Sequence, residues 1–189
     1  MRAAVTTLCA LIVSLAAAAP ARADGLITPY VGFNFGGNSL NCTGLTNCDD
    51  KQTNWGVTFS STNGIFGLAE DIGYAPDFFG KTPGASNSVL HFMTDFMVIV
   101  PAGPVRPYAF IGIGLIRSHA KFDASALSLS QNALGNDLGG GLDVFFSHSV
   151  GVRGELRHLR TFQDLDLGIF SANDKLEFWR AAAGLTLKF

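Results

Sequence analysis

Two neighbouring Ser and His pairs carry the side chains best suited to nucleophilic chemistry. Ser118 precedes His119, and His148 precedes Ser149. A histidine can take the proton of a serine hydroxyl, which then attacks an ester, provided that an acidic side chain orients the imidazole. His148 and Ser149 fall in a short turn between two expected strands, whereas Ser118 and His119 fall at the far end of a strand. Ser118 and His119 are therefore the better candidates for an esterase site.

Cysteine chemistry is confined to one short segment of the expected mature chain. Cys9 lies in an N-terminal stretch that we expect to be removed, which leaves Cys42 and Cys48 in "NCTGLTNC". An exported protein meets an oxidising environment, so we expect Cys42 and Cys48 to form a disulfide across a small loop. No further Cys or His lies nearby to complete a metal site. We expect neither a metal nor another cofactor.

The N-terminus has the form of a secretory signal peptide. Arg2 supplies a short basic region, an apolar stretch runs from Leu8 to Ala19, and residues 21–23 have the A-x-A form. We expect cleavage after Ala23, so that residues 1–23 are the signal peptide and residues 24–189 the mature domain. Loss of Arg2 and Arg22 leaves 11 basic against 15 acidic residues, a net charge of −4. This balance offers no basic face for nucleic acid.

The mature sequence is apolar without containing an apolar helix. Mean hydropathy is +0.28 and only 15% of residues are charged. The longest apolar candidate, "SVLHFMTDFMVIVP", is interrupted by His91 and Asp95. A transmembrane β-barrel gives this combination, because only every second residue of each strand has to be apolar.

Eight segments alternate with the period of a strand, and none has a convincing helical period. We expect long connections between the first and second, third and fourth, fifth and sixth, and seventh and eighth segments, and short turns between the others. Residues 119–135, the third long connection, could hold a brief helix, and residues 161–174 form the fourth. The pattern predicts an all-β fold, a single eight-stranded antiparallel up-and-down transmembrane β-barrel, with both termini on the periplasmic side. The segments are 26–36, 54–61, 65–75, 88–100, 105–118, 136–146, 150–160 and 175–189.

The seventh segment decides which face is inside. Arg153, Glu155 and Arg157 share one face, and a basic side chain facing lipid at mid-bilayer costs roughly 2–4 kcal/mol. Placed inside, these charges can meet partners and fill a narrow lumen that has no open pore. By the same alternation, the predicted lumen charge network comprises His91, Asp95, Asp143, Arg153, Glu155, Arg157, Arg180 and Lys188.

Some residues do not fit simple alternation. Glu70 and Asp71 are adjacent, so either a β-bulge turns both inward or Glu70 reaches a membrane interface. Aromatic residues near strand ends suit the interfacial girdles of a membrane barrel. We expect this place for Trp55, Tyr108, Phe178 and Trp179.

The chain resembles the small outer-membrane β-barrel domain family, related in form to the outer membrane protein A transmembrane barrel. The stretches that carry the resemblance are "FGLAEDIGYAPDFFG", "VRPYAFIGIGLIRS", "NDLGGGLDVFFSHSVGVRGELRHLR" and the terminal "GLTLKF". The ending is similar to the signal by which barrel-assembly machinery recognises its substrates, here Gly184, Leu187 and Phe189. Ala182 departs from that pattern, which asks for a polar residue two before the glycine.

The resemblance implies an integral protein of the bacterial outer membrane. We expect it to be non-enzymatic, with a structural or surface-contact role through four extracellular loops. Its expected partners are outer-membrane lipid, lipopolysaccharide and the assembly machinery, but not nucleic acid. The alternatives are a lipid A-modifying esterase resembling the lipid A deacylases, a narrow solute channel, or a soluble lipocalin-like barrel.

Overall fold

The computed structural model of the 189-residue chain describes residues 24–36, 52–78, 85–122, 127–166 and 171–189. The expected signal peptide 1–23 and the cysteines Cys42 and Cys48 lie outside these ranges. All elements of the described residues are strands: β1 Asp24–Phe35, β2 Gln52–Asn63, β3 Phe66–Pro76, β4 Ala85–Ile99, β5 Val105–Phe122, β6 Leu127–Phe145, β7 Val150–Asp166 and β8 Ser171–Lys188.

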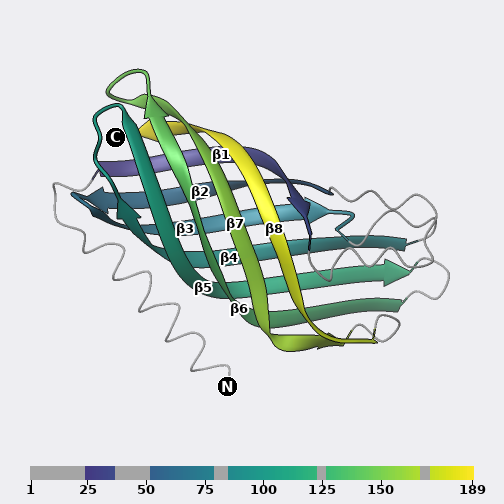
Figure 1. Ribbon diagram of the computed structural model, residues 1–189. Coiled ribbons are helices and arrows are strands. Elements are labelled where there is room, and N and C mark those ends of the chain that lie inside the picture. The colour runs from purple at the N-terminus through teal and green to yellow at the C-terminus, as the bar shows by residue number, and fades with distance from the viewer. Residues whose placement is uncertain (1–23, 37–51, 79–84, 123–126, 167–170) are drawn as a thin grey trace.

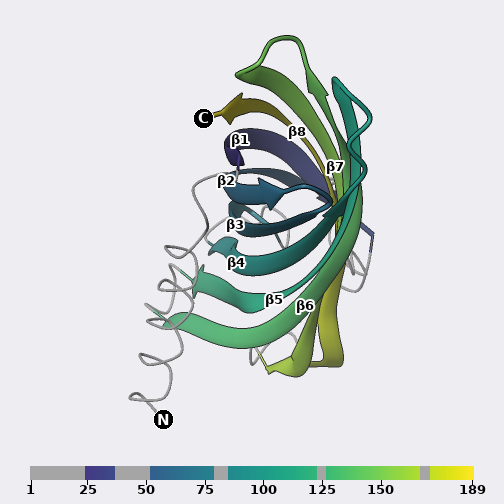
Figure 2. The same cartoon turned by 90° about the vertical axis from the view of Figure 1, so that its left-hand side faces the viewer.

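The eight strands form one closed antiparallel barrel in chain order, β1 to β8 (Figures 1 and 2). The predicted fold class and strand count are confirmed. The barrel closes where β1 meets β8: Gly25 donates to the Phe189 carbonyl at 3.1 Å, and Phe189 donates to the Gly25 carbonyl at 2.9 Å. The last residue of the chain therefore takes part in closing the barrel. Within the described residues, no helix has the length and apolar character needed to cross a membrane.

Side chains alternate strictly between the two faces of the barrel wall. On β5, Ile111 and Ile113 are 60% and 66% exposed on the outside, while Phe110 and Ile116 are buried inside. A large apolar outer surface over an interior that holds buried charged side chains reverses the pattern of a water-soluble barrel. This arrangement argues against the lipocalin-like alternative.

Two of the expected long connections are wrong. Residues 119–135 hold no helix within the described part: β5 continues to Phe122 and β6 begins at Leu127, paired residue by residue. Likewise β7 runs to Asp166 and β8 starts at Ser171. A strand that projects beyond the bilayer needs no apolar outward face, so its sequence lacks the alternation on which the prediction depended.

The β-bulge considered for Glu70 and Asp71 does not form. Pairing of β3 with β2 and with β4 runs through both residues without a register shift. Asp71 points inward and is fully buried, whereas Glu70 points outward and accepts a hydrogen bond from Thr94 Oγ1 at 2.8 Å. An ionisable group therefore stands on the apolar outer surface, four residues from the end of β3 at the β2–β3 turn.

Replacing Glu70 with Val is expected to stabilise the barrel by about 1 kcal/mol, because a carboxyl group on the lipid face carries a desolvation cost. The free energy of unfolding in lipid vesicles, measured by denaturant titration, checks this. Thr94→Val is the matched control, because it leaves the carboxyl group without its hydrogen-bond donor, and it should lower stability. A loss of stability in Glu70→Val would mean that the outward carboxyl group has a stabilising partner in the membrane.

The interior is layered along the barrel axis. One apolar cluster includes Val89, Met93 and Ile116, and a second includes Met97 and Tyr108. On β4, His91 and Asp95 lie between these apolar positions, so polar and apolar side chains interleave in the lumen.

The prediction that four aromatic residues lie in the interfacial girdles is half wrong. Trp55 and Trp179 face outward, but Tyr108 and Phe178 are 5% and 1% exposed and pack inside the barrel.

Candidate functional site: the charged interior of the barrel

Arg157 is the centre of the interior charges. Its guanidinium group is 1% exposed and donates to Asp95 Oδ2 at 2.8 Å, to Glu155 Oε1 at 3.0 Å and to Asp137 Oδ2. Its guanidinium carbon also lies 4.1 Å from the centroid of the Phe110 ring. These contacts satisfy the planar fork of donors from three sides and cover one of its faces. Arg157 thereby ties β4, β6 and β7 together across the lumen.

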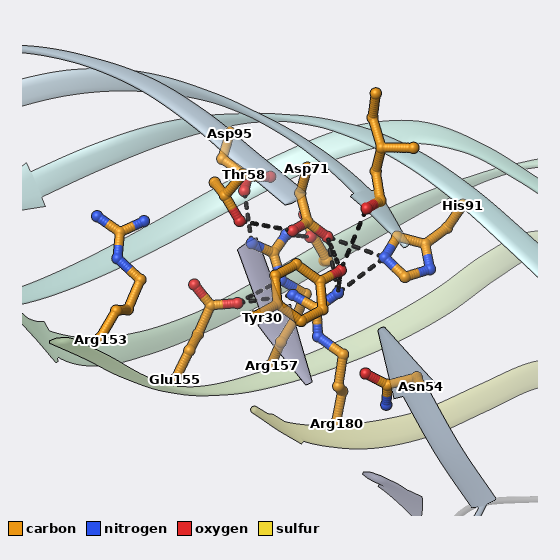
Figure 3. A network of polar contacts seen from close by, with 12 residues as sticks. Tyr30, Asn54, Thr58, Asp71, His91, Asp95, Arg153, Glu155, Arg157 and Arg180 are labelled. Carbon is orange, nitrogen blue, oxygen red and sulfur yellow. Dashed lines mark hydrogen bonds and ion pairs between the residues drawn. The ribbon is translucent and has the colours of Figure 1, made fainter. Parts of the chain in front are cut away.

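Arg180 is a second centre, on β8. Its Nη1 lies 2.7 Å from Asp71 Oδ2, 2.5 Å from the Tyr30 hydroxyl and 2.8 Å from His91 Nε2. His91 Nε2 is also 2.8 Å from Asp71 Oδ2, and Thr58 Oγ1 donates to Asp71 Oδ1 at 2.9 Å. Figure 3 shows these side chains converging from strands that are distant in the sequence.

Glu155 joins the two centres into one network. Its Oε1 accepts from Arg157 Nε at 3.0 Å and from Arg180 Nη2 at 2.7 Å (Figure 3). Its Oε2 accepts from the Tyr108 hydroxyl at 2.9 Å. One carboxylate shared by two guanidinium groups separates their positive charges, which would otherwise repel each other in a medium of low dielectric constant.

The remaining predicted lumen residues lie apart from this network. Arg153 and Asp143 form their own bidentate pair, with Nε to Oδ1 at 2.7 Å and Nη2 to Oδ2 at 2.9 Å. Lys188 lies near the end of β8, and its Nζ is 2.6 Å from Asp24 Oδ2 at the start of β1. Of the eight predicted residues, the structure brings five into one network: His91, Asp95, Glu155, Arg157 and Arg180.

Two interior carboxylates were missing from the predicted set. Asp137 has the same parity as Asp143 on β6, so alternation alone could have placed it inside. Asp71 could not be placed, because its neighbour Glu70 competes for the same face. Tyr30 lies inside and alternates with the outward-facing Val31. Its role as a hydrogen-bond partner of Arg180 depends on a register across the β1–β8 seam that local sequence does not encode.

The network leaves little room for anything else. A cavity of about 10 Å³ lies among Tyr30, Thr58, Arg153 and Glu155, which is about the smallest space that can hold one water molecule. Within the residues that the structure describes, no group of three or more His, Cys, Asp or Glu side chains is arranged to hold a metal ion. The arrangement can hold charge and fix strand register.

The candidate esterase pair is not brought together. Ser118 points into the barrel and is fully buried, whereas His119 lies on the outer surface. His119 Nδ1 instead lies 2.7 Å from the Ser130 hydroxyl across the β5–β6 pair. No carboxylate among the described residues forms a hydrogen bond to His119, so the third member of a triad is absent from this part of the chain. His148 and Ser149 are exposed in the short β6–β7 turn.

The cations of the outer surface gather on one side of the barrel. Strands β1 to β4 contain no Lys or Arg. Arg117 and Lys121 on β5, Arg160 on β7 and Lys175 on β8 are exposed towards one end of the barrel. This end, here called the distal end, lies opposite the start of β1 and the end of β8. We name these four residues the distal cationic arc. The other side carries aromatic residues at this end, with the Trp55 and Tyr74 rings 5.6 Å apart.

Comparison with known proteins agrees with this architecture. The family model described as "Outer membrane protein beta-barrel domain" matches residues 7–189. The chain belongs to this family. Membership of this family means that the apolar outer surface faces the lipid of a bacterial outer membrane. A search of curated protein sequences finds no match to the chain.

Solved structures of small barrels share the fold. Neisserial surface protein A (NspA) is 13% identical, with a TM-score of 0.64 over 88% of this chain and 97% of that one. Ail of Yersinia pestis, solved with the heparin analogue sucrose octasulfate, is 12% identical, with a TM-score of 0.56 over 87% and 98%. OprH of P. aeruginosa is 15% identical, with a TM-score of 0.55 over 88% and 99%. At these identities the likeness establishes the fold alone.

Proposed function

We propose that this outer-membrane barrel is a non-enzymatic surface protein whose distal end binds lipopolysaccharide through the distal cationic arc. The observation that carries the proposal is that, among the described residues, the outward Lys and Arg at this end lie on β5, β7 and β8, whereas β1 to β4 have none. Anionic phosphate groups of lipid A lie at the outer face of the outer membrane. Each Lys or Arg near an anionic membrane surface contributes about 1 kcal/mol of attraction.

The proposed orientation places the distal end outside the cell. The two longest connections, residues 36–51 after β1 and 77–84 after β3, join strand ends at the distal end. The connections after β2, β4 and β6 lie at the same end as the β1 start and the β8 end (Figure 1). Outer-membrane barrels have short periplasmic turns and longer extracellular loops. In the proposal, residues 1–23 direct export and are removed, and Gly184, Leu187 and Phe189 form the signal read by the assembly machinery. The four distal connections are the extracellular loops, and a Cys42–Cys48 disulfide stiffens the first of them.

The filled lumen supports a contact role over a channel role. Arg157 and Arg180 with their carboxylate partners are each at most 5% exposed, and they cross the barrel between strands of opposite walls. A solute would have to break several charge-assisted hydrogen bonds to pass. We therefore propose that binding takes place on the outer surface and at the loops.

A likeness to Ail supports a polyanionic partner. Ail was solved with sucrose octasulfate, which carries sulfate groups on a sugar core. Lipid A is likewise an anionic sugar, with phosphate in place of sulfate. The distal cationic arc offers the matching charge. The aromatic residues on the other side of the barrel, such as Trp55 on β2, suit the interfacial region of the bilayer.

The test is the affinity of the refolded protein in detergent for lipopolysaccharide, measured by calorimetric titration. The quadruple variant R117Q/K121Q/R160Q/K175Q is expected to lose about 4 kcal/mol, roughly a thousandfold in affinity. The matched control is R106Q/K188Q, which removes two cations at the opposite end and should change affinity by about twofold at most. Dephosphorylated lipopolysaccharide should bind the wild-type protein as weakly as the quadruple variant binds the intact form.

Two results would contradict the proposal. An equal loss of affinity per charge in R106Q/K188Q would show non-specific attraction to the whole barrel. A change in the mass of lipid A in cells that express the protein, abolished by Ser130→Ala, would assign acyl-ester chemistry to the His119–Ser130 pair and remove the non-enzymatic role.

A further inference from the structure

Among the residues that the structure describes, two buried carboxylate oxygens in the barrel interior have no hydrogen-bond partner. They are Oδ1 of Asp95 and Oδ1 of Asp137, on residues that are 1% and 0% exposed. The other oxygen of each carboxylate, Oδ2, contacts Arg157. An unpaired oxygen on a buried carboxylate is costly, so the pair requires a physical explanation.

Gly112 brings the two oxygens together. Asp95 on β4 and Asp137 on β6 both pair in register with Gly112 on β5, which lies between them. A Cβ atom on Gly112 would stand 2.1 Å from Asp95 Oδ1 and 2.4 Å from Asp137 Oδ1. Both oxygens therefore lean into the space that the glycine leaves open, and these two distances, 2.1 Å and 2.4 Å, place the oxygens at most 4.5 Å apart.

The charges around Arg157 do not balance when every carboxyl group is ionised. Arg153 and Asp143 neutralise each other as a separate pair. Arg157 and Arg180 then face four buried carboxyl groups, which are Asp71, Asp95, Asp137 and Glu155. Two adjacent carboxylates in a medium of low dielectric constant do not both ionise readily, and one proton shared between them relieves the repulsion.

We propose that Asp95 and Asp137 form a proton-binding site, in which one proton bridges Oδ1 of one residue and Oδ1 of the other at neutral pH. Ionised carboxylates only accept hydrogen bonds, so two facing acceptors repel. With the proton, one group donates and the other accepts, and both Oδ2 atoms remain on Arg157. The site holds one negative charge against one guanidinium group.

The shared proton has a consequence for stability. The unfolded chain releases it above a pH of about 4, the ordinary range of aspartate. The folded protein then holds one proton more than the unfolded one, so the equilibrium constant for unfolding rises tenfold per pH unit until the folded pair ionises. Stability contributed by this site is thus present at acidic pH and lost as the pH rises. The other titratable and charged groups of the network that surround the pair are Asp71 on β3, His91 on β4, Glu155 and Arg157 on β7, and Arg180 on β8.

Infrared spectroscopy of the full chain in detergent tests the proposal. At neutral pH the wild-type protein should show the carbonyl stretch of one protonated carboxyl group, and labelling with carboxyl-¹³C aspartate should shift that band. D95N and D137N should each fold, since the amide can donate to the facing carboxylate, and each should lose the band. They should also lose the tenfold dependence of the unfolding constant on pH.

Matched controls separate this site from other carboxyl groups. E70Q removes the outward-facing carboxyl group and D143N removes a carboxylate paired with its own arginine, and both should keep the band. Absence of the band from the wild-type protein at neutral pH would overturn the proposal, because both carboxylates would then be ionised. Its persistence in both D95N and D137N would also overturn it, because the proton would then reside elsewhere.

Discussion

Replacing Arg157 with Met is expected to destabilise the barrel by about 3–5 kcal/mol, the cost of leaving buried charges without their partner. Asp95, Asp137 and Glu155 all direct an oxygen at the guanidinium group of Arg157. Met has a similar length and keeps most of the packing against Phe110, so the loss reports charge and hydrogen bonding. Denaturant titration in lipid vesicles, followed by the slower migration of the unfolded form on unheated gels, measures the effect.

A rescue experiment separates charge from packing in this variant. Adding D95N and D137N to Arg157→Met removes two of the stranded carboxylates and is expected to recover about half of the loss. Arg106→Met is the matched control, because Arg106 is partly exposed and its nearest carboxylate, on Asp24, is 3.7 Å away. It should change stability by about 0.5 kcal/mol or less. A loss in Arg157→Met no larger than that of Arg106→Met would show that the network contributes nothing to the fold.

The sequence predicts which face of the barrel wall each residue takes better than it predicts which interior side chains pair. Alternation on the seventh segment places Arg153, Glu155 and Arg157 inside, because the cost of a lipid-facing arginine decides the register of that strand. Alternation is local, and it determines only which face a residue takes. Whether Arg157 meets Asp95 of β4 or Asp143 of β6 depends on strand stagger around the whole closed sheet. No single segment carries that information.

The distal ends of the longer strands show a second limit. Beyond the bilayer, neither face of a strand has to be apolar, so residues 119–135 lose the pattern that distinguishes a strand from a loop. Ser118 and His119 illustrate the consequence for the site. As strand neighbours they point to opposite faces of the wall, and the partner of His119 is Ser130 from the next strand. Spacing along the chain therefore paired His119 with Ser118, which points to the opposite face of the wall. Cross-strand pairing instead places Ser130 beside His119.

Replacing Gly112 with Ala is expected to cost 3 kcal/mol or more, or to prevent folding, because three oxygens already occupy the space of the added methyl group. Besides Asp95 Oδ1 and Asp137 Oδ1, the Thr94 carbonyl oxygen would lie 2.7 Å from the new Cβ. Overpacking of a core typically costs about 1–3 kcal/mol. Here the backbone carbonyl cannot move without breaking the β4–β5 pairing, and the carboxylates cannot move without leaving Arg157, so the cost should lie at or above that range.

Gly154→Ala is the matched control for Gly112→Ala. Gly154 lies on β7 and faces outward, and no atom lies within 4 Å of the position of its Cβ. Within a strand, alanine is favoured over glycine by about 0.5–1 kcal/mol, so this variant should be neutral or slightly more stable. The free energies of unfolding of the two variants should thus move in opposite directions. If Gly112→Ala were as stable as the wild-type protein, the carboxylates could not be held against Gly112, and the crowded contact between β4, β5 and β6 would be refuted.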